Sequence, residues 1–183
     1  MAQVKIVVTG PFGAGKTTLI KTISEIAVVS TERGISDHTK VHKKDTTVAM
    51  DFGRITIDDG LVLYLFGTPG QERFDFMWEI LAEGMLGFVL MVDAERRESL
   101  DEATRILDAF STFGSHPYVV AVNKHGNDPD ESVAEARRTL GLNGEVPVLP
   151  LDALDRQSVK EVLLALLYAV LEGIEGKPLA TTA

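Results

Sequence analysis

The stretch "VKIVVTGPFGAGKTTLI", residues 4–20, places a β-branched run directly before a glycine-rich turn and the start of a helical pattern. Within it, "GPFGAGKT" satisfies G-x-x-x-x-G-K-[S/T] from Gly10 to Thr17. The glycines in this pattern let backbone N–H groups turn inward around phosphate oxygens, and the following helix points its positive end at them. A strand, this loop and a helix in that order predict a phosphate-binding loop.

Each position of the loop has an expected role. Lys16 is expected to place its ammonium between the two terminal phosphates, and Thr17 to bind Mg²⁺ through its hydroxyl. The bulky Phe12, in the middle of the loop, is expected to overhang the terminal phosphate. The predicted phosphate-binding residues are Gly10, Gly13, Ala14, Gly15, Lys16, Thr17 and Thr18.

The rest of the chain alternates apolar runs of strand length with segments of helical period, which is typical of an α/β fold with a mostly parallel sheet. "TVAMDFGRITI" (47–57) and "LVLYLFG" (61–67) flank an Asp-Gly turn, so these two strands are expected to pair antiparallel. The runs "GFVLMVDA", "YVVAVNK" and "VPVLPLDA" suit strands covered on both faces. Helical patterns cover 98–113, 130–140 and 157–172.

We therefore predict one domain over residues 1–175, with six strands, one of them antiparallel, and about five helices, followed by a disordered tail from 176 to 183. A chain of 183 residues is long enough to bury its own core. The polar connection over residues 30–46 is long for a compact domain, and such connections are usually functional.

Composition excludes several classes of function. Asp and Glu outnumber Lys and Arg by 27 to 18, and a net charge of -9 argues against nucleic acid or an anionic membrane as the main partner. The absence of cysteine excludes disulfides, a catalytic thiol and a prenyl anchor. The first ten residues lack signal-peptide architecture, and the longest apolar stretch falls short of the ~20 residues of a membrane span. We expect a cytoplasmic protein without a stable membrane anchor.

The spacing of four further segments narrows the kind of nucleotide protein. These segments are "TTVAMDFG" at 46–53, "FGTPGQERF" at 66–74, "NK" at 123–124 and "DA" at 152–153. Together with the phosphate loop they resemble the Ras-like small GTPases over nearly the whole chain. "TVAMDF" and "GQERF" look like the Rab and Arf branches, and "FGTPGQERF" with "PLDA" is similar to bacterial Ras-like GTPases of the gliding-motility and conservon type.

The resemblance implies a phosphate sensor and a catalytic set. Thr47 matches a threonine that ligates Mg²⁺ and meets the terminal phosphate. Gly70 matches the glycine whose N–H contacts that phosphate, and Gln71 matches the residue that orients the attacking water. Lys16, Gly70 and Gln71 are thus the implied catalytic residues. Residues 31–50 and 67–77 would be the two segments that respond to the nucleotide.

The resemblance also implies a base pocket and partners. Asn123 and Lys124 match the start of the guanine-recognition motif, and Ala153, with Leu154 beside it, matches the small residue whose N–H reads the guanine carbonyl. The implied ligands are GTP and GDP with Mg²⁺. The implied protein partners are regulators and effectors, among which the bacterial resemblance suggests a roadblock-type dimer.

Two positions lack an expected carboxylate. Gly67 stands where a small GTPase has the aspartate that holds a magnesium-bound water, so we expect weaker magnesium binding, with Asp51 or Glu72 as candidate substitutes. "NKHG" has Gly126 where N-K-x-D has the aspartate that accepts hydrogen bonds from guanine. Either Asp128 swings into the pocket or base selectivity is relaxed, and we favour guanine.

A third departure is Phe12, which predicts slow intrinsic hydrolysis because it occupies room that water, Gln71 and an incoming arginine would need. An arginine from a partner is then excluded, or the arginine comes from within the chain, with Arg54 and Arg73 as candidates. The apolar segment "FMW", residues 76–78, is either core or a surface that faces an effector.

The sequence therefore predicts a guanine-nucleotide-binding switch that hydrolyses GTP to GDP slowly. The alternative is a P-loop scaffold that does not hydrolyse nucleotide or does not select the base. A nucleotide or small-molecule kinase is disfavoured because no arginine-rich lid is present. The arginine pairs at 96–97 and 137–138 are interpreted as helix surface.

Overall fold

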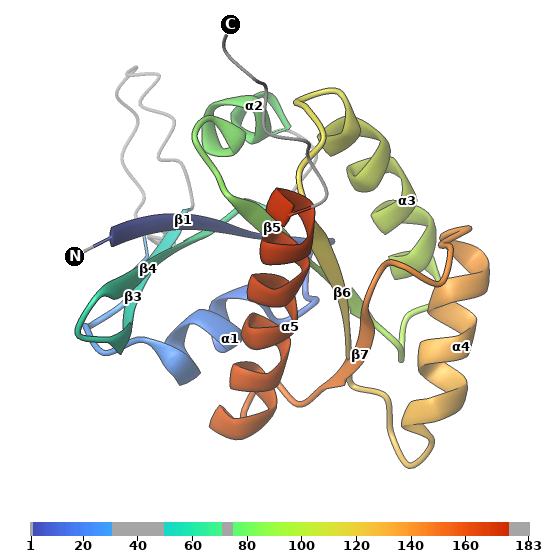
Figure 1. The fold of residues 1–183 in the computed structure, drawn as a ribbon. Helices are drawn as coiled ribbons and strands as arrows, with labels where there is room; N and C mark the ends of the chain where they lie inside the picture. The colour runs from blue at the N-terminus through green and yellow to red at the C-terminus, as the bar shows by residue number, and fades with distance from the viewer. Residues whose placement is uncertain (1, 31–49, 71–74, 176–183) are drawn as a thin grey trace, which may run out of the picture.

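The computed structural model describes residues 2–30, 50–70 and 75–175 of the chain. Within these ranges the protein forms a seven-stranded sheet in the order β2-β3-β4-β1-β5-β6-β7 with five helices packed on it (Figure 1). The strands are β1 (Ala2–Thr9), β2 (Val29–Ser30), β3 (Asp51–Asp58), β4 (Leu61–Gly67), β5 (Gly87–Asp93), β6 (Tyr118–Asn123) and β7 (Val148–Leu151). The helices are α1 (Lys16–Ile23), α2 (Phe76–Ala82), α3 (Glu98–Ser111), α4 (Pro129–Thr139) and α5 (Arg156–Glu175). The predictions for Thr47, for residues 71–74 and for the tail from 176 lie outside the described residues.

The strand directions confirm the predicted α/β class. β1 is parallel to β4 and β5, and β6 is parallel to β5 and β7. β3 runs antiparallel to β4, so six long strands form a mostly parallel sheet with one antiparallel member. The seventh strand, β2, was not predicted because its two residues are too few to show a period.

The β3–β4 hairpin forms at the predicted Asp-Gly turn. The Gly60 N–H donates to Asp58 Oδ1 over 2.7 Å, and this bond closes the turn. The resulting register places Asp51, the first residue of β3, opposite Gly67, the last residue of β4. Gly67, which lacks the expected carboxylate, and Asp51, one of the candidate substitutes, are therefore cross-strand neighbours.

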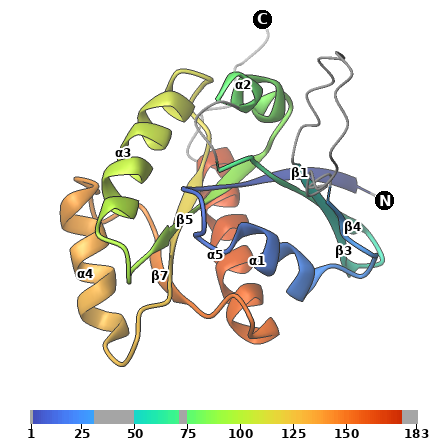
Figure 2. The same ribbon diagram turned by 180° about the vertical axis from the view of Figure 1, so that it is seen from behind.

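The core lies in two layers, one on each face of the sheet. Helices α1 and α5 cover one face, while α2, α3 and α4 cover the other (Figures 1 and 2). Successive residues of β5 alternate between the layers: Val89 and Met91 join the first, and Phe88, Leu90 and Val92 join the second. Because both faces are covered, these strands read as continuous apolar runs rather than alternating ones.

The helices follow the predicted patterns with shifted ends. The helix predicted to open after the phosphate loop stops at Ile23, because Ser24 adopts an extended backbone (φ -62°, ψ 138°) and its Oγ accepts the Arg54 N–H over 3.2 Å. The last helix extends a few residues beyond the predicted 157–172. No helix within the described ranges combines the length and the apolarity needed to traverse a bilayer.

The parallel strands β1, β4, β5, β6 and β7 all end at the same edge of the sheet. The register pairs Val8 with Gly67, Thr9 with Leu90, and Asp93 with Asn123. The loops that follow these strands therefore meet at one edge, which is where open α/β sheets place their ligand sites.

Helix α5 offers a direct test of the first core layer. Leu166 is fully buried, whereas Leu164 on the same helix is 45% exposed. We expect Leu166→Ala to lower the free energy of unfolding by about 2–5 kcal/mol, because it leaves a cavity in a packed core. The matched control Leu164→Ala should change it by about 0.5 kcal/mol. Urea unfolding measures both, and equal losses would contradict the described packing of α5.

Candidate nucleotide-binding site

The phosphate loop runs from the end of β1 to the start of α1 and packs tightly against the sheet. Gly10 and Gly15 have φ values of 145° and 103°, in the region that favours glycine. A Cβ at Gly10 would overlap the Met91 carbonyl oxygen, and one at Gly15 would lie 2.5 Å from Asn123 Nδ2. Glycine is required at both positions because the loop backbone lies directly against β5 and β6.

Lys16 and Gly70, two of the residues predicted to be catalytic, come together over this loop. The Lys16 Nζ donates to the carbonyls of Gly10 and Pro11, both over 2.7 Å, and the side chain is 8% exposed. A Cβ at Gly70 would lie 2.8 Å from Lys16 Nζ and 2.7 Å from Phe12 Cα. The backbone after β4 thus approaches both the ammonium and the loop, as a phosphate sensor requires.

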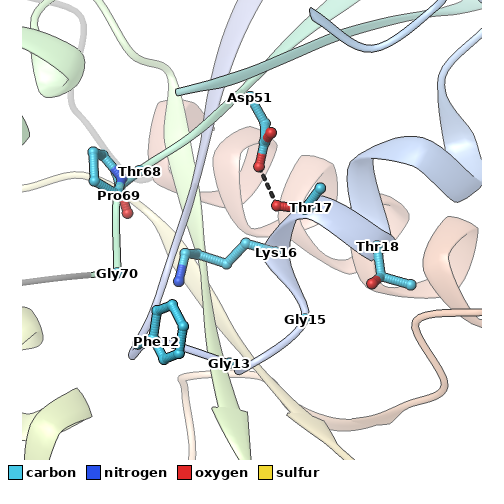
Figure 3. A pocket seen from close by; sticks show the side chains of 10 residues that line it. All are labelled: Phe12, Gly13, Gly15, Lys16, Thr17, Thr18, Asp51, Thr68, Pro69 and Gly70. Atoms are coloured by element: carbon cyan, nitrogen blue, oxygen red, sulfur yellow. Dashed lines mark hydrogen bonds between the residues drawn. The ribbon is translucent and has the colours of Figure 1, made fainter. Parts of the chain in front are cut away.

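One cavity is lined by five of the seven predicted phosphate-binding residues, without Gly10 and Ala14 (Figure 3). Its lining consists of Phe12, Gly13, Gly15, Lys16, Thr17, Thr18, Asp51, Thr68, Pro69 and Gly70. Pro69 has no N–H to offer and the Thr68 N–H donates to the Val8 carbonyl over 2.9 Å, whereas Gly70 lies against the loop. Phe12 is one of the lining residues and has 59% of its surface exposed.

Arg96 supports the loop, a role that the sequence interpretation missed. Its Nη1 donates to the Phe12 carbonyl over 2.7 Å, and its Nη2 pairs with Glu102 at 3.3 Å. We had interpreted the pair at 96–97 as helix surface, but Arg96 lies in the connection between β5 and α3. The available signal was its position, since residues that follow a parallel strand lie at the ligand edge of the sheet.

A second cavity adjoins the first and holds the predicted base-binding residues. Its lining consists of Gly13, Gly15, Thr18, Asn123, Lys124, His125, Gly126, Leu151, Asp152, Ala153 and Leu154. Asn123 Nδ2 donates to the Ala14 carbonyl over 3.0 Å, and its Oδ1 accepts the Ala153 N–H over 3.3 Å. This one side chain ties the phosphate loop to the loop after β7.

Lys124 makes a parallel connection. Its Nζ donates to the Gly13 carbonyl over 3.2 Å and pairs with Asp93 Oδ2 at 2.6 Å. Asp93 is 1% exposed, so it is a buried carboxylate whose charge is balanced by this lysine. The structure therefore brings together all four residues predicted around the base and joins them to the phosphate loop.

The structure places the nearby carboxylates differently from the sequence expectation. Asp128 caps helix α4, where its Oδ1 accepts the Glu131 N–H over 3.0 Å, and it does not line the base cavity. Asp152 does line that cavity, and its Oδ1 accepts the Leu154 N–H over 2.9 Å. Asp152 was assigned no role of its own from the sequence beyond the "DA" segment, yet it follows the parallel strand β7 directly.

At the other end of the site, Thr17 carries a candidate metal-binding hydroxyl. This hydroxyl donates to Asp51 Oδ2, and both side chains line the phosphate cavity (Figure 3). Hydroxyl and carboxylate oxygens are suitable ligands for Mg²⁺, which also takes oxygens from phosphates and water. The two other residues considered for this role, Thr47 and Glu72, lie outside the described residues.

The remaining candidates separate into three cases. Arg54 pairs with Tyr64 in the β3–β4 ladder and is not among the residues that line either cavity, so its position does not favour a catalytic role. Gln71 and Arg73 lie outside the described residues. Of the segment 76–78, Trp78 is core, 9% exposed with its ring centroid 6.1 Å from that of Phe110, whereas Phe76 is 62% exposed.

Comparisons with known proteins place the chain in a family described by nucleotide binding. Residues 28–172 match the model of a family described as conserved hypothetical ATP binding protein, a range that begins after the phosphate loop. An uncharacterized protein of Methanocaldococcus jannaschii is 33% identical over 124 residues, which cover 67% of this chain and 70% of that protein.

Small GTPases are more distant relatives over a longer range. ADP-ribosylation factor-like protein 3 of Saccharomyces cerevisiae is 24% identical over 170 residues, 88% of this chain and 82% of that protein. Human Ras-related protein Rab-4B is 28% identical over 178 residues, 93% of this chain and 78% of that protein. These matches confirm the predicted relationship to the Ras-like proteins at a coarse level. The chain belongs to the family described as conserved hypothetical ATP binding protein, and it combines a P-loop motif with a distant similarity to the small GTPases.

Proposed function

We propose that this protein is a guanine-nucleotide-binding switch that holds GTP or GDP with Mg²⁺ and hydrolyses GTP slowly. The approach of Gly70 to Lys16 and to the backbone of Phe12 carries this proposal. A terminal phosphate bound by Lys16 would also meet the Gly70 N–H, which belongs to the segment after β4. The presence or loss of that phosphate would then act on residues 67–77 through Gly70, and on residues 31–50 through Thr47.

Hydrolysis in this proposal depends on positioning and charge. Lys16 and the Gly70 N–H stabilise charge on the terminal phosphate, while Gln71 orients the attacking water. Bound Mg²⁺ supplies neutralisation of the phosphate charge, with Thr17 and Thr47 as its proposed protein ligands. Phe12 lines the same cavity, so it restricts the approach of water and of an arginine from a partner.

Guanine is favoured over adenine by the contents of the base cavity. A carboxylate oxygen of Asp152 remains to accept hydrogen bonds beyond the one from the Leu154 N–H, because a carboxylate offers about four acceptor sites. Guanine presents two N–H donors along one edge, where adenine presents a ring-nitrogen acceptor and a C–H, so a carboxylate that faces this edge pairs with guanine and not with adenine. The description of the family as ATP binding makes this the first point to test.

Base selectivity should depend on Asp152 and not on Asp128. On nucleotide-stripped protein with Mg²⁺, we expect GDP and GTP to bind at least about tenfold more tightly than ADP and ATP, and Asp152→Ala to reduce that ratio toward one. Asp128→Ala, the matched control, should lower stability by about 1 kcal/mol through loss of the helix cap but keep the ratio. Isothermal titration calorimetry with GDP, GTP, ADP and ATP measures this ratio of affinities for each variant. Equal or tighter binding of adenine nucleotides by the unmodified protein would contradict the choice of guanine.

Intrinsic hydrolysis should be limited by the Phe12 side chain. We expect Phe12→Ala and Phe12→Gly both to raise the single-turnover rate of GTP hydrolysis, by about tenfold or more, because a misplaced water is costly in rate. The bond from Arg96 to the Phe12 carbonyl is a backbone contact and survives both changes. Phosphate release under single-turnover conditions is the measurement. If neither variant is faster, Phe12 is not the obstacle.

The alternative is a scaffold that binds nucleotide without turnover or without selecting the base. The absence of a carboxylate at Gly67 and at Gly126 favours it. In either case the output would be contact with a protein partner, and the exposed Phe76, within the proposed responsive segment 67–77, offers an apolar contact. The resemblance to bacterial Ras-like GTPases supports a roadblock-type dimer as the partner to try first. Nucleotide binding with no phosphate release, even with that partner, would select the scaffold.

A further inference from the structure

Gly67 has a close neighbour that fills the space an aspartate there would use. A Cβ built on Gly67 would lie 3.1 Å from Asp51 Cβ and 3.4 Å from Asp51 Oδ2, and 2.9 Å from Ile20 Cδ1. Asp51 reaches this place from the opposite strand, because the β3–β4 register pairs the two residues directly. The space beside Gly67 is thus already occupied by a carboxylate.

Asp51 also has the contacts expected of a metal-anchoring group. Its Oδ2 accepts the hydroxyl proton of Thr17, the proposed Mg²⁺ ligand of the phosphate loop (Figure 3). A threonine hydroxyl has one proton and two lone pairs. When the proton is given to Asp51, the lone pairs are left for the metal, and the negative partner makes the oxygen a better ligand. Among the residues that the structure describes, none donates a hydrogen bond to the other carboxylate oxygen, which could therefore accept one from a metal-bound water.

We propose that Asp51 replaces the missing aspartate of Gly67 as the carboxylate that anchors Mg²⁺, so that this function has moved to the cross-strand neighbour. This inference rests on the proposed function, because it requires a magnesium nucleotide in the phosphate cavity. It revises the expectation of a weak magnesium site: the anchor is present but comes from β3. Positioning of Thr17 and of the metal-bound water is the role assigned to Asp51.

The charge of Asp51 gives the proposal a signature that a purely structural hydrogen bond lacks. A carboxylate next to the phosphate site repels an anionic ligand when no metal lies between them and attracts it through the metal when one does. Asp51→Asn keeps the shape and an acceptor for Thr17 but removes the charge. Loss of this charge should therefore weaken nucleotide binding in the presence of Mg²⁺. Without Mg²⁺, nucleotide binding should be unchanged or improved.

The test measures the affinity of a fluorescent GDP analogue for the full chain, stripped of nucleotide, over a range of free Mg²⁺ that begins in EDTA. For Asp51→Asn we expect the midpoint of the Mg²⁺ dependence to rise by about 10- to 100-fold, the usual effect of losing a group that orients a metal ligand. Asp59→Asn is the matched control. Asp59 is exposed in the β3–β4 turn, so this change alters the net charge equally and should leave the midpoint unchanged.

A transfer of the carboxylate between strands provides a second, independent test. Gly67→Asp alone places two carboxylates side by side and should not improve magnesium binding. In the double variant Asp51→Ala with Gly67→Asp, the Asp51 carboxylate is gone, the flexible end of Ile20 must move, and the Cβ retained at position 51, 3.1 Å away, must shift by about a few tenths of an ångström. We expect this double variant to recover the Mg²⁺ midpoint to within a few-fold of the unmodified protein.

The outcomes separate this inference from the proposed function. If the unmodified protein binds the GDP analogue with a clear Mg²⁺ dependence that Asp51→Asn retains, Asp51 is not the anchor although the nucleotide site stands. If it binds the analogue equally with and without Mg²⁺, the inference also fails while guanine binding remains. If it binds no nucleotide, both fail. Thermal melting of each variant checks folding, and Asp51→Ser, which keeps a smaller acceptor, replaces Asp51→Asn should that variant not fold.

Discussion

The close contact between the phosphate loop and the ends of β5 and β6 is the constraint on which the site depends. No side chain fits at Gly10, against the Met91 carbonyl, or at Gly15, against the amide of Asn123. This contact lets Asn123 and Lys124 bond to the carbonyls of Ala14 and Gly13. Three loops from separate parts of the chain are held as one surface, so a ligand on the loop would meet groups from all of them.

The charges around this surface are arranged locally, against the character of the whole chain. The protein carries a net charge of -9, yet the phosphate loop presents the ammonium of Lys16 and the N-terminus of α1. Buried Asp93 faces Lys124 at 2.6 Å. The long-range field of the protein therefore repels polyanions, while a compact phosphate finds donors at short range.

Two aspartates of the small-GTPase pattern are replaced by glycine in this chain, and in each case the structure shows another carboxylate nearby. Where this chain has Gly67 in place of the aspartate of the pattern, the carboxylate of Asp51 lies across the hairpin. Where it has Gly126 in place of the second aspartate, Asp152 lines the same cavity from the loop after β7. In both cases a carboxylate from a different strand or loop lies near the position where this chain lacks one. Under the proposed function, these two carboxylates would serve the metal and the base in place of the aspartates that this chain lacks.

Much of the fold and part of the site were readable from the sequence, because they depend on local patterns. The glycine-rich loop, the apolar runs of the central strands, the Asp-Gly hairpin and the helical periods each have a physical cause within a few residues. The same locality explains why β2, with two residues, was missed. It also explains why Lys16, Thr17, Asn123 and Ala153 were identified, since each stands next to a strand end or a loop of fixed pattern.

The tertiary structure decided the contacts that join distant segments. Whether Asp51 or another acid accompanies Thr17 depends on the β3–β4 register, and a shift of one residue would send the Asp51 side chain to the other face of the sheet. Asp128 caps α4 while Asp152 enters the base cavity, a choice made by loop geometry rather than by residue type. The sequence by itself determined the kind of site and its place at the sheet edge. Which carboxylates enter the site was decided only by the packing of strands and loops. A side chain's partners across a sheet depend on strand pairing and not on its neighbours in the chain.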